Sequence, residues 1–196
     1  MPELILYLAS ASPRRQELLR QLGIGFEVLP STIVERRAPA ESPADYVQRM
    51  AREKARHGAG SMRERGLPVR PVLGADTEVV VDDEVLGKPQ DRAHAAQLLH
   101  RLSGRTHTVL SALCLLMPAG EHIALNENRV RFAALNDNDI KSYLATGEAD
   151  DKAGAYAIQG RAAGFIAHLH GSYSGVMGLP LYELRELLQQ AGLEYS

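Results

Sequence analysis

LILYLASASPRR, residues 4–15, decides how this chain begins to fold. The apolar run Leu4–Ala9 is typical of a buried strand, and it leads directly into a polar turn that begins a helix. Ser12 is a good N-cap residue, and Pro13 suits the first helical position because its missing N–H would be unpaired there. The free N–H groups of a helix start, with two arginines beside them, favour an anion. A capped surface helix with two solvated arginines explains the same residues.

The composition is that of an ordinary globular protein of 196 residues, with 45% hydrophobic and 23% charged residues. The formal net charge of −2 argues against a general binder of nucleic acid or of acidic membranes, which would be basic. No apolar stretch reaches the ~18 residues of a membrane span, and no basic region precedes the first apolar run. Cys114, the single cysteine, lies in an apolar run and is expected in the core. We therefore expect a cytoplasmic protein without membrane or nucleic-acid partners.

Alternating apolar runs and turn signals predict an α/β fold with a mixed sheet. Strands are expected at 4–9, 26–29, 72–75, 78–81, 84–86, 106–117, 122–132 and 165–169. Helices are expected at 13–22, 43–54, 91–102, 136–144 and 181–191. Residues 58–71, 150–164 and 171–178 are expected to be surface connections, loops or irregular segments.

Several common enzyme motifs are missing from the sequence. There is no G-x-x-x-x-G-K-[ST] phosphate loop, no G-x-G-x-x-G after a strand and no G-x-S-x-G elbow. The seven histidines are scattered, and no Cys/His cluster has the spacing of a zinc site. Charged residues at the ends of apolar elements are therefore the remaining candidates for chemistry.

Asp76 directly follows the expected strand 72–75, and α/β sheets commonly place ligand sites at strand ends. A carboxylate there can hold Mg²⁺ or Mn²⁺, or orient a water as general base, although a turn cap explains it equally well. Glu35 is a candidate second carboxylate for the same ion. Lys54 and Lys88 are candidates for binding phosphate oxygens, although lysines are commonly just solvated.

Taken together, the positive residues match the charge of a nucleoside triphosphate. Phosphoryl chemistry requires groups that clamp the phosphates, a metal that bridges them and an activated water. The carboxylates offer a metal site, and about four positive charges are available from Arg14, Arg15, Lys54 and Lys88.

Six blocks occur in order along the chain: SASPRRQELL (10–19), REKA (52–55), GADT (74–77), GKP (87–89), LSGRTH (102–107) and DKAGAYAIQG (151–160). They resemble the Maf family of nucleoside triphosphate pyrophosphatases, which act on non-canonical or pyrimidine nucleotides. The match runs from residue 4 to VMGLPL (176–181) and covers nearly the whole chain. The resemblance implies a single domain, 1–196, whose elongated mixed β-sheet, flanked by helices, forms two lobes around a central cleft, as in inosine triphosphatase-like proteins.

The resemblance also implies roles for individual residues. Asp76 matches the family's acid, the proton acceptor that activates the attacking water, together with a divalent metal. The phosphate-binding loop of the family is matched by Ser10, Arg14 and Arg15. The cleft residues that hold metal and triphosphate are matched by Glu35, Lys54 and Lys88. The positions associated with substrate choice are matched by Arg14, Thr77 and Gln159. This arginine, threonine and glutamine pattern resembles the dTTP/UTP branch. The amide of Gln159 can both donate to and accept from a uracil or thymine edge.

The reaction that the resemblance implies is hydrolysis between the α- and β-phosphates, which gives a nucleoside monophosphate and pyrophosphate. A protein of a different class, a nucleotide-binding regulator of septum formation without turnover, would need the anion loop and Gln159 but no placed acid. Asp76 therefore favours the enzyme. The apolar hairpin that carries Cys114 fits either a core or the interface of a homodimer.

Overall fold

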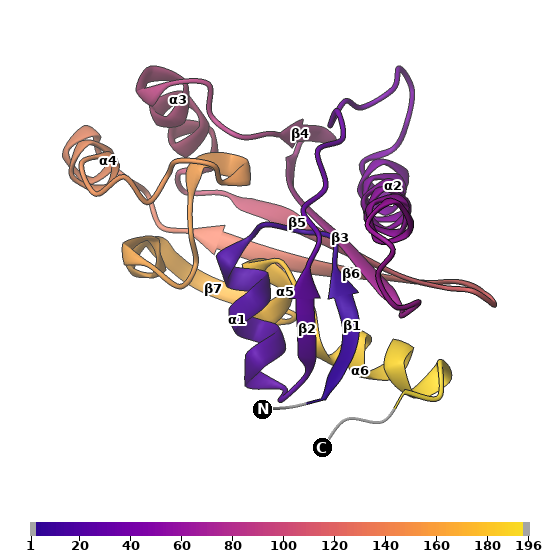
Figure 1. Ribbon diagram of the computed structural model, residues 1–196. Helices are drawn as coiled ribbons and strands as arrows, with labels where there is room; N and C mark the ends of the chain where they lie inside the picture. The colour runs from indigo at the N-terminus through magenta and orange to yellow at the C-terminus, as the bar shows by residue number, and fades with distance from the viewer. Residues whose placement is uncertain (1–2, 194–196) are drawn as a thin grey trace.

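The computed structural model describes residues 3–193 and shows helices packed against one mixed sheet of seven strands (Figure 1). The strands are β1 (Leu4–Leu8), β2 (Gly25–Val28), β3 (Val72–Val81), β4 (Glu84–Leu86), β5 (Thr106–Met117), β6 (Gly120–Phe132) and β7 (Ile166–His170). The helices are α1 (Pro13–Gln21), α2 (Pro43–Glu64), α3 (Arg92–Leu102), α4 (Asp137–Leu144), α5 (Tyr173–Met177) and α6 (Leu181–Gln190), with 3-10 turns at Ala153–Ala155 and Arg161–Phe165. Within residues 3–193, every helix is too short or too polar to span a membrane.

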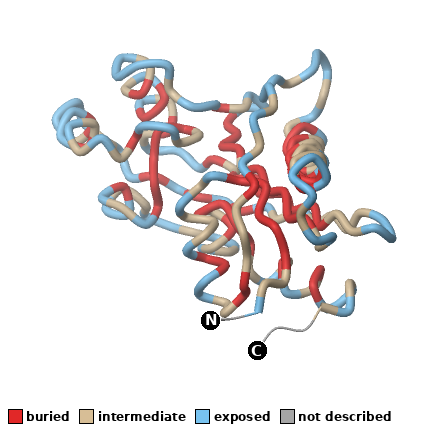
Figure 2. The backbone as a smooth tube through the Cα atoms, in the orientation of Figure 1, coloured by how far each residue is buried: buried red, intermediate tan, exposed pale blue. Residues whose placement is uncertain are grey.

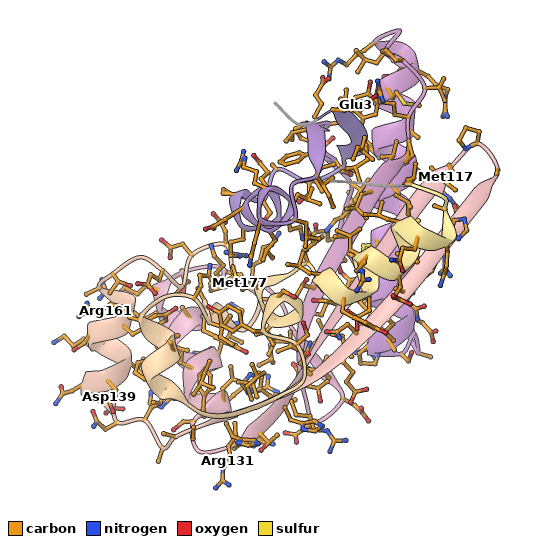
Figure 3. All side chains as sticks on the ribbon, turned by 90° about the horizontal axis from the view of Figure 1, so that it is seen from below. Glu3, Met117, Arg131, Asp139, Arg161 and Met177 are labelled. Carbon is orange, nitrogen blue, oxygen red and sulfur yellow. The ribbon has the colours of Figure 1, made fainter. Side chains whose placement is uncertain are left out.

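The sheet is mixed, as the sequence predicts. Its order is β2-β1-β3-β5-β6-β7, and β4 pairs with the end of β3. β1 runs parallel to β2 and β3, and the remaining pairs are antiparallel. The β5–β6 hairpin is long, and Met117 and Arg131 mark its two ends in Figure 3. This hairpin makes the sheet elongated, whereas the expected division into two lobes stays a prediction.

The two faces of the sheet are covered by different helices. α2 packs on one face, where its Val47, Ala51 and Ala55 meet alternate residues of β5, among them Ala112 and Cys114. Residues of α1, α3 and α6 join the larger cluster on the other face. Figure 2 shows the sheet centre buried and the outer turns of the helices exposed. Cys114 is fully buried, so its place in the core is confirmed.

Helix α2 is longer than the sequence predicts, since it continues through residues 58–64, which were expected to be a surface connection. Gly58 is the reason for the difference. A Cβ at this position would lie 2.8 Å from the Cβ of Ala9 and 3.0 Å from Val72. The glycine therefore lets α2 pass close to β1 and β3 instead of ending the helix.

Strand β3 is also longer than expected, because it does not end at Asp76-Thr77. It continues to Val81, and β5 pairs with it from Val72↔Leu116 to Val80↔Thr108. A second difference lies in 171–178, which was expected to be a loop. It contains α5, where Ser172 accepts a hydrogen bond from the amide of Gly175 and Gly178 ends the helix with φ 113°.

Candidate active site

A cleft of about 910 Å³ lies between the start of α1, the middle of β3 and the segment 151–159. Met177, which also lines it, lies near the centre of the molecule in Figure 3. The structure brings all the predicted site residues together around this cleft: Ser10, Arg14, Arg15, Glu35, Lys54, Asp76, Thr77, Lys88 and Gln159. The resemblance to the family predicts that these residues, from distant parts of the chain, meet at one cleft.

The SASPRR loop folds as the sequence predicts. Ser12 is the N-cap of α1, where its hydroxyl accepts a hydrogen bond from the amide of Arg15 at 3.5 Å, and Pro13 begins the helix. The hydroxyl of Ser10 accepts a hydrogen bond from the amide of Ser12 at 3.3 Å. The helix therefore begins at the wall of the cleft, where its free N–H groups favour an anion.

The two arginines of this loop are held by the protein. Arg15 donates to the carbonyl of Gly178 at 2.8 Å, to Ser10 Oγ at 3.1 Å and to Thr77 Oγ1 at 3.3 Å. Three of the five N–H groups of this guanidinium are therefore used inside the protein. Arg14 donates to the carbonyl of Met177 at 3.4 Å. Burial lowers the pKa of both arginines below the usual value for arginine.

Asp76 lies in the middle of β3, which corrects the expectation that it follows a strand. This part of the strand is accessible because β1 pairs with β3 only as far as Leu73, and β4 begins to pair at Val79. Between these points, within the described residues, no strand covers that edge of β3. Side chains alternate along a strand, so Asp76 and Glu78 point to one face and Thr77 to the other. All three line the cleft.

Two lysines and two carboxylates alternate along one wall of the cleft. The ammonium of Lys54 lies 2.6 Å from Asp76 Oδ1 and 2.6 Å from Glu35 Oε1. Lys88 lies 3.2 Å from Glu35 Oε2. Burial alone would raise the pKa of Glu35, but the two lysines outweigh it and hold this pKa below its ordinary value. Both lysines, expected as free charges for phosphate, are therefore paired with carboxylates in this structure.

Glu78 is a site residue that the sequence reasoning missed. Its side chain is buried, and its Oε2 has no hydrogen-bond partner among the described residues. Burial, together with the charges of Asp76 and Glu35, raises the pKa of Glu78 to about 8. The signal was present in the sequence, since two acidic residues two apart in an otherwise apolar strand must share one face.

The donor set fits the expected divalent cation in its chemistry. Asp76 Oδ2 and Glu78 Oε2 are buried oxygens without a partner in the described part of the chain, and hard cations prefer such ligands. Among residues 3–193, no group of three or more His, Cys, Asp or Glu side chains is arranged to hold an ion alone. Mg²⁺ commonly keeps several waters or substrate oxygens as ligands, so a small carboxylate set suits it.

The segment that carries Gln159 packs against aromatic side chains of the core. The hydroxyl of Tyr156 and Nε2 of His107 lie 2.8 Å apart in the core, and Tyr143 accepts a hydrogen bond from the amide of Ala157 at 3.1 Å. The ring of Phe132 packs edge-on against Tyr156 at 4.9 Å. Gln159 itself is exposed at the mouth of the cleft, so its amide is accessible to a ligand.

Comparison with known proteins gives a consistent result. A family model described as Maf-like protein matches residues 5–191. A protein of Ralstonia nicotianae is 51% identical over 195 residues, which cover 96% of this chain and 94% of the relative. Proteins of Nitrosospira multiformis (50% identical) and Nitrosomonas europaea (47%) match 96% of this chain and 95% of their own length. All three relatives are named dTTP/UTP pyrophosphatase.

Proposed function

Because the chain belongs to the Maf-like protein family, we propose that it hydrolyses dTTP and UTP to the nucleoside monophosphate and pyrophosphate. The observation that carries the proposal is the position of Asp76. It is a buried carboxylate with one unpartnered oxygen, in a cleft that also holds the cationic start of α1. Hydrolysis of a phosphoanhydride needs an acceptor for the proton of water beside groups that hold phosphate.

The phosphates are proposed to lie against the SASPRR loop. The N–H groups at the start of α1 and the guanidinium of Arg14 face the cleft and can hold phosphate oxygens. Arg15 has two N–H groups left after its internal bonds, so it fixes the loop and adds positive charge. Lys54 and Lys88 reach the same cleft from the opposite wall and can turn from carboxylate to phosphate.

Asp76 is proposed as the proton acceptor. In the free protein Lys54 donates to Oδ1, whereas Oδ2 has no partner among the described residues and is the oxygen that would accept the proton of a water aimed at the α-phosphorus. The bond from that phosphorus to the bridging oxygen then breaks, and pyrophosphate leaves with its charge held by the cationic loop.

A divalent cation, Mg²⁺ or Mn²⁺, belongs to the proposal, with Asp76 and Glu35 as ligands and Glu78 beside them. When bound, such an ion neutralises phosphate charge and makes a water more acidic. The chain's own contribution is to gather these carboxylates at one cleft. Glu35 and Asp76 share the ammonium of Lys54 at 2.6 Å each, so they lie close enough for one small cation to replace it.

The base is proposed to be read at the mouth of the cleft. Gln159 is exposed there, and its amide can donate to and accept from the imide edge of uracil or thymine. Thr77 and Arg14 line the same cleft and complete the set of residues proposed for substrate choice. We also propose that the enzyme acts in the cytoplasm on free nucleotides, without nucleic acid, and that it can form a homodimer.

The test is pyrophosphate release from a panel of nucleoside triphosphates with Mg²⁺ or Mn²⁺. Turnover is expected to be fastest with dTTP and UTP, and the products are expected to be the monophosphate and pyrophosphate. Release of single phosphates, or no release from any triphosphate although nucleotide binds, contradicts the proposal. The second of these results would favour a nucleotide-binding regulator.

A further inference from the structure

Two hydroxyl groups meet behind the cleft, and their protons can be assigned from the contacts. Thr77 on β3 lies directly opposite Ser111 on β5, and the two side-chain oxygens are 2.9 Å apart. Ser111 is fully buried, and its Oγ also lies 2.7 Å from the carbonyl oxygen of Gly175 in α5. Three oxygens are thus linked in a row, and only the first two carry a proton.

The direction of the protons follows from the carbonyl. A carbonyl oxygen only accepts, so the proton of Ser111 must lie between Ser111 and Gly175. The 2.9 Å contact between the hydroxyls then requires the proton of Thr77, because Ser111 has no second proton to give. On its other side, Thr77 Oγ1 accepts from Nη2 of Arg15 at 3.3 Å. The hydroxyl of Thr77 therefore has no proton left for a ligand, and one lone pair remains.

We infer that Ser111 is a positioning residue for base selection, because it fixes Thr77 as a hydrogen-bond acceptor toward the cleft. The inference rests on the proposed function. Uracil and thymine carry an N–H at N3, which an acceptor can bind, whereas cytosine carries an acceptor at N3. With cytosine, Thr77 Oγ1 and N3 would be two acceptors facing each other, so no hydrogen bond forms and both atoms stay unpaired. Thr77 therefore favours uracil over cytosine.

Ser111 could also have a purely structural role, since it joins α5 to β5. The two roles make different predictions. A structural tie affects all nucleotides alike, because the end of α5 and its C-cap Gly178 accept the hydrogen bonds of Arg14 and Arg15. If Ser111 instead controls the direction of the Thr77 proton, its loss changes the ratio of kcat/KM for uracil nucleotides to kcat/KM for cytosine nucleotides.

The experiment compares kcat/KM for UTP and CTP in Ser111→Ala and in wild type. In the variant the proton of Thr77 has lost its acceptor and can be offered to N3 of cytosine. The UTP-to-CTP ratio is expected to fall about tenfold, the size of one hydrogen bond. Ser111→Thr keeps a hydroxyl and is expected to restore the ratio. Ser103→Ala, which removes a half-buried hydroxyl bonded to Leu135 away from the cleft, is the matched control and should leave the ratio unchanged.

Thr77 gives an independent test if Ser111→Ala does not fold. Thr77→Val has no acceptor and should lower the ratio about tenfold, whereas Thr77→Ser should retain it. A wild-type preference for UTP that both Ser111→Ala and Thr77→Val leave intact overturns this inference alone. If wild type hydrolyses neither UTP nor CTP, the proposed function and this inference fall together.

Discussion

Replacing Lys54 with methionine should destabilise the protein strongly, because two carboxylates are paired with this ammonium. Lys54 lies 2.6 Å from both Asp76 and Glu35, and only 10% of its side chain is exposed. Methionine keeps the length and shape of the side chain but not its charge. In the variant Asp76 is buried with no partner on either oxygen and has Glu78 on the same face of β3.

The size of the effect follows from burial. Removing one partner of a buried ion pair typically costs about 3–5 kcal/mol, because the remaining charge is left uncompensated. Glu35 keeps Lys88 as a partner and is one-third exposed, so the lower limit applies here, about 3 kcal/mol. In a chain of this length, each kcal/mol lowers Tm by about 2–4 °C, so a decrease of about 6–12 °C is expected.

Denaturant unfolding at neutral pH measures this cost in Lys54→Met, Asp76→Asn and the double variant. Asp76→Asn should cost less, since Lys54 keeps Glu35 as its partner, and the double variant should be more stable than Lys54→Met alone. Lys141→Met, on the exposed face of α4, is the matched control and should change stability by no more than about 0.5 kcal/mol.

A loss below about 1 kcal/mol in Lys54→Met would refute the reasoning, since such a value is typical of a surface ion pair. Mn²⁺ should stabilise Lys54→Met more than wild type, because the unpartnered carboxylates are then available to a cation. Equal stabilisation of both proteins by Mn²⁺ would contradict the proposed metal ligands and leave the ion-pair argument intact.

Three further predictions concern single residues. Asp76→Asn should lower kcat for dTTP at least about 100-fold with a Tm within a few degrees of wild type, and near-normal pyrophosphate release would contradict its role as proton acceptor. Gln159→Ala should reduce kcat/KM for dTTP more than for purine nucleotides, and equal losses would count against base reading. Burial lowers the pKa of His107 to about 4, so between about pH 6.5 and 4 the unfolded chain binds a proton that the folded protein does not. The free energy of unfolding should therefore decrease by up to about 3 kcal/mol as the pH falls through this range. In His107→Gln this decrease should be smaller, and an equally steep decrease in the variant would contradict the role of His107.

Most of the fold could be predicted because its elements carry local signals. Ser12 marks the start of α1, and the structure confirms its cap hydrogen bond. Ser42 and Asn136 cap α2 and α4 in the same way, at the helix starts that the sequence predicts. The predicted ends of α2 and β3 were wrong because tertiary contacts determine where these elements end. Gly58 resembles a helix terminator in the sequence, but its role is to let α2 approach β1.

The error at β3 has a different cause. A polar pair after an apolar run normally indicates the end of a strand, yet Asp76 and Thr77 remain in the sheet. Asp76 is compensated by Lys54, 22 residues earlier, and Thr77 by Ser111, 34 residues later. Neither partner can be identified from local sequence. A polar pair inside an apolar strand is costly without partners, so its presence there already indicates a site.

The same limit applies to the candidate site. The sequence correctly predicts which residues line the cleft, because each carries a polar or charged side chain and all but Glu35 lie in the blocks that resemble the family. It does not predict that Lys54 and Lys88 are neutralised by Glu35 and Asp76, or that Arg15 is used mainly to hold the loop. Charge counting therefore overestimates the free positive charge that meets an incoming triphosphate.

This pairing gives Lys54 two tasks. In the free protein its ammonium compensates Asp76 and Glu35, and in the proposed complex it would turn toward phosphate. The turn is favourable only when another cation takes over the carboxylates, since otherwise Asp76 would remain buried and unpaired. Tight binding of triphosphate and binding of a divalent cation should therefore depend on each other, and the dependence should weaken in Lys54→Met. Titration calorimetry with a non-hydrolysable dTTP analogue, with and without Mg²⁺, measures this coupling; independent binding in wild type would show that Lys54 does not exchange partners.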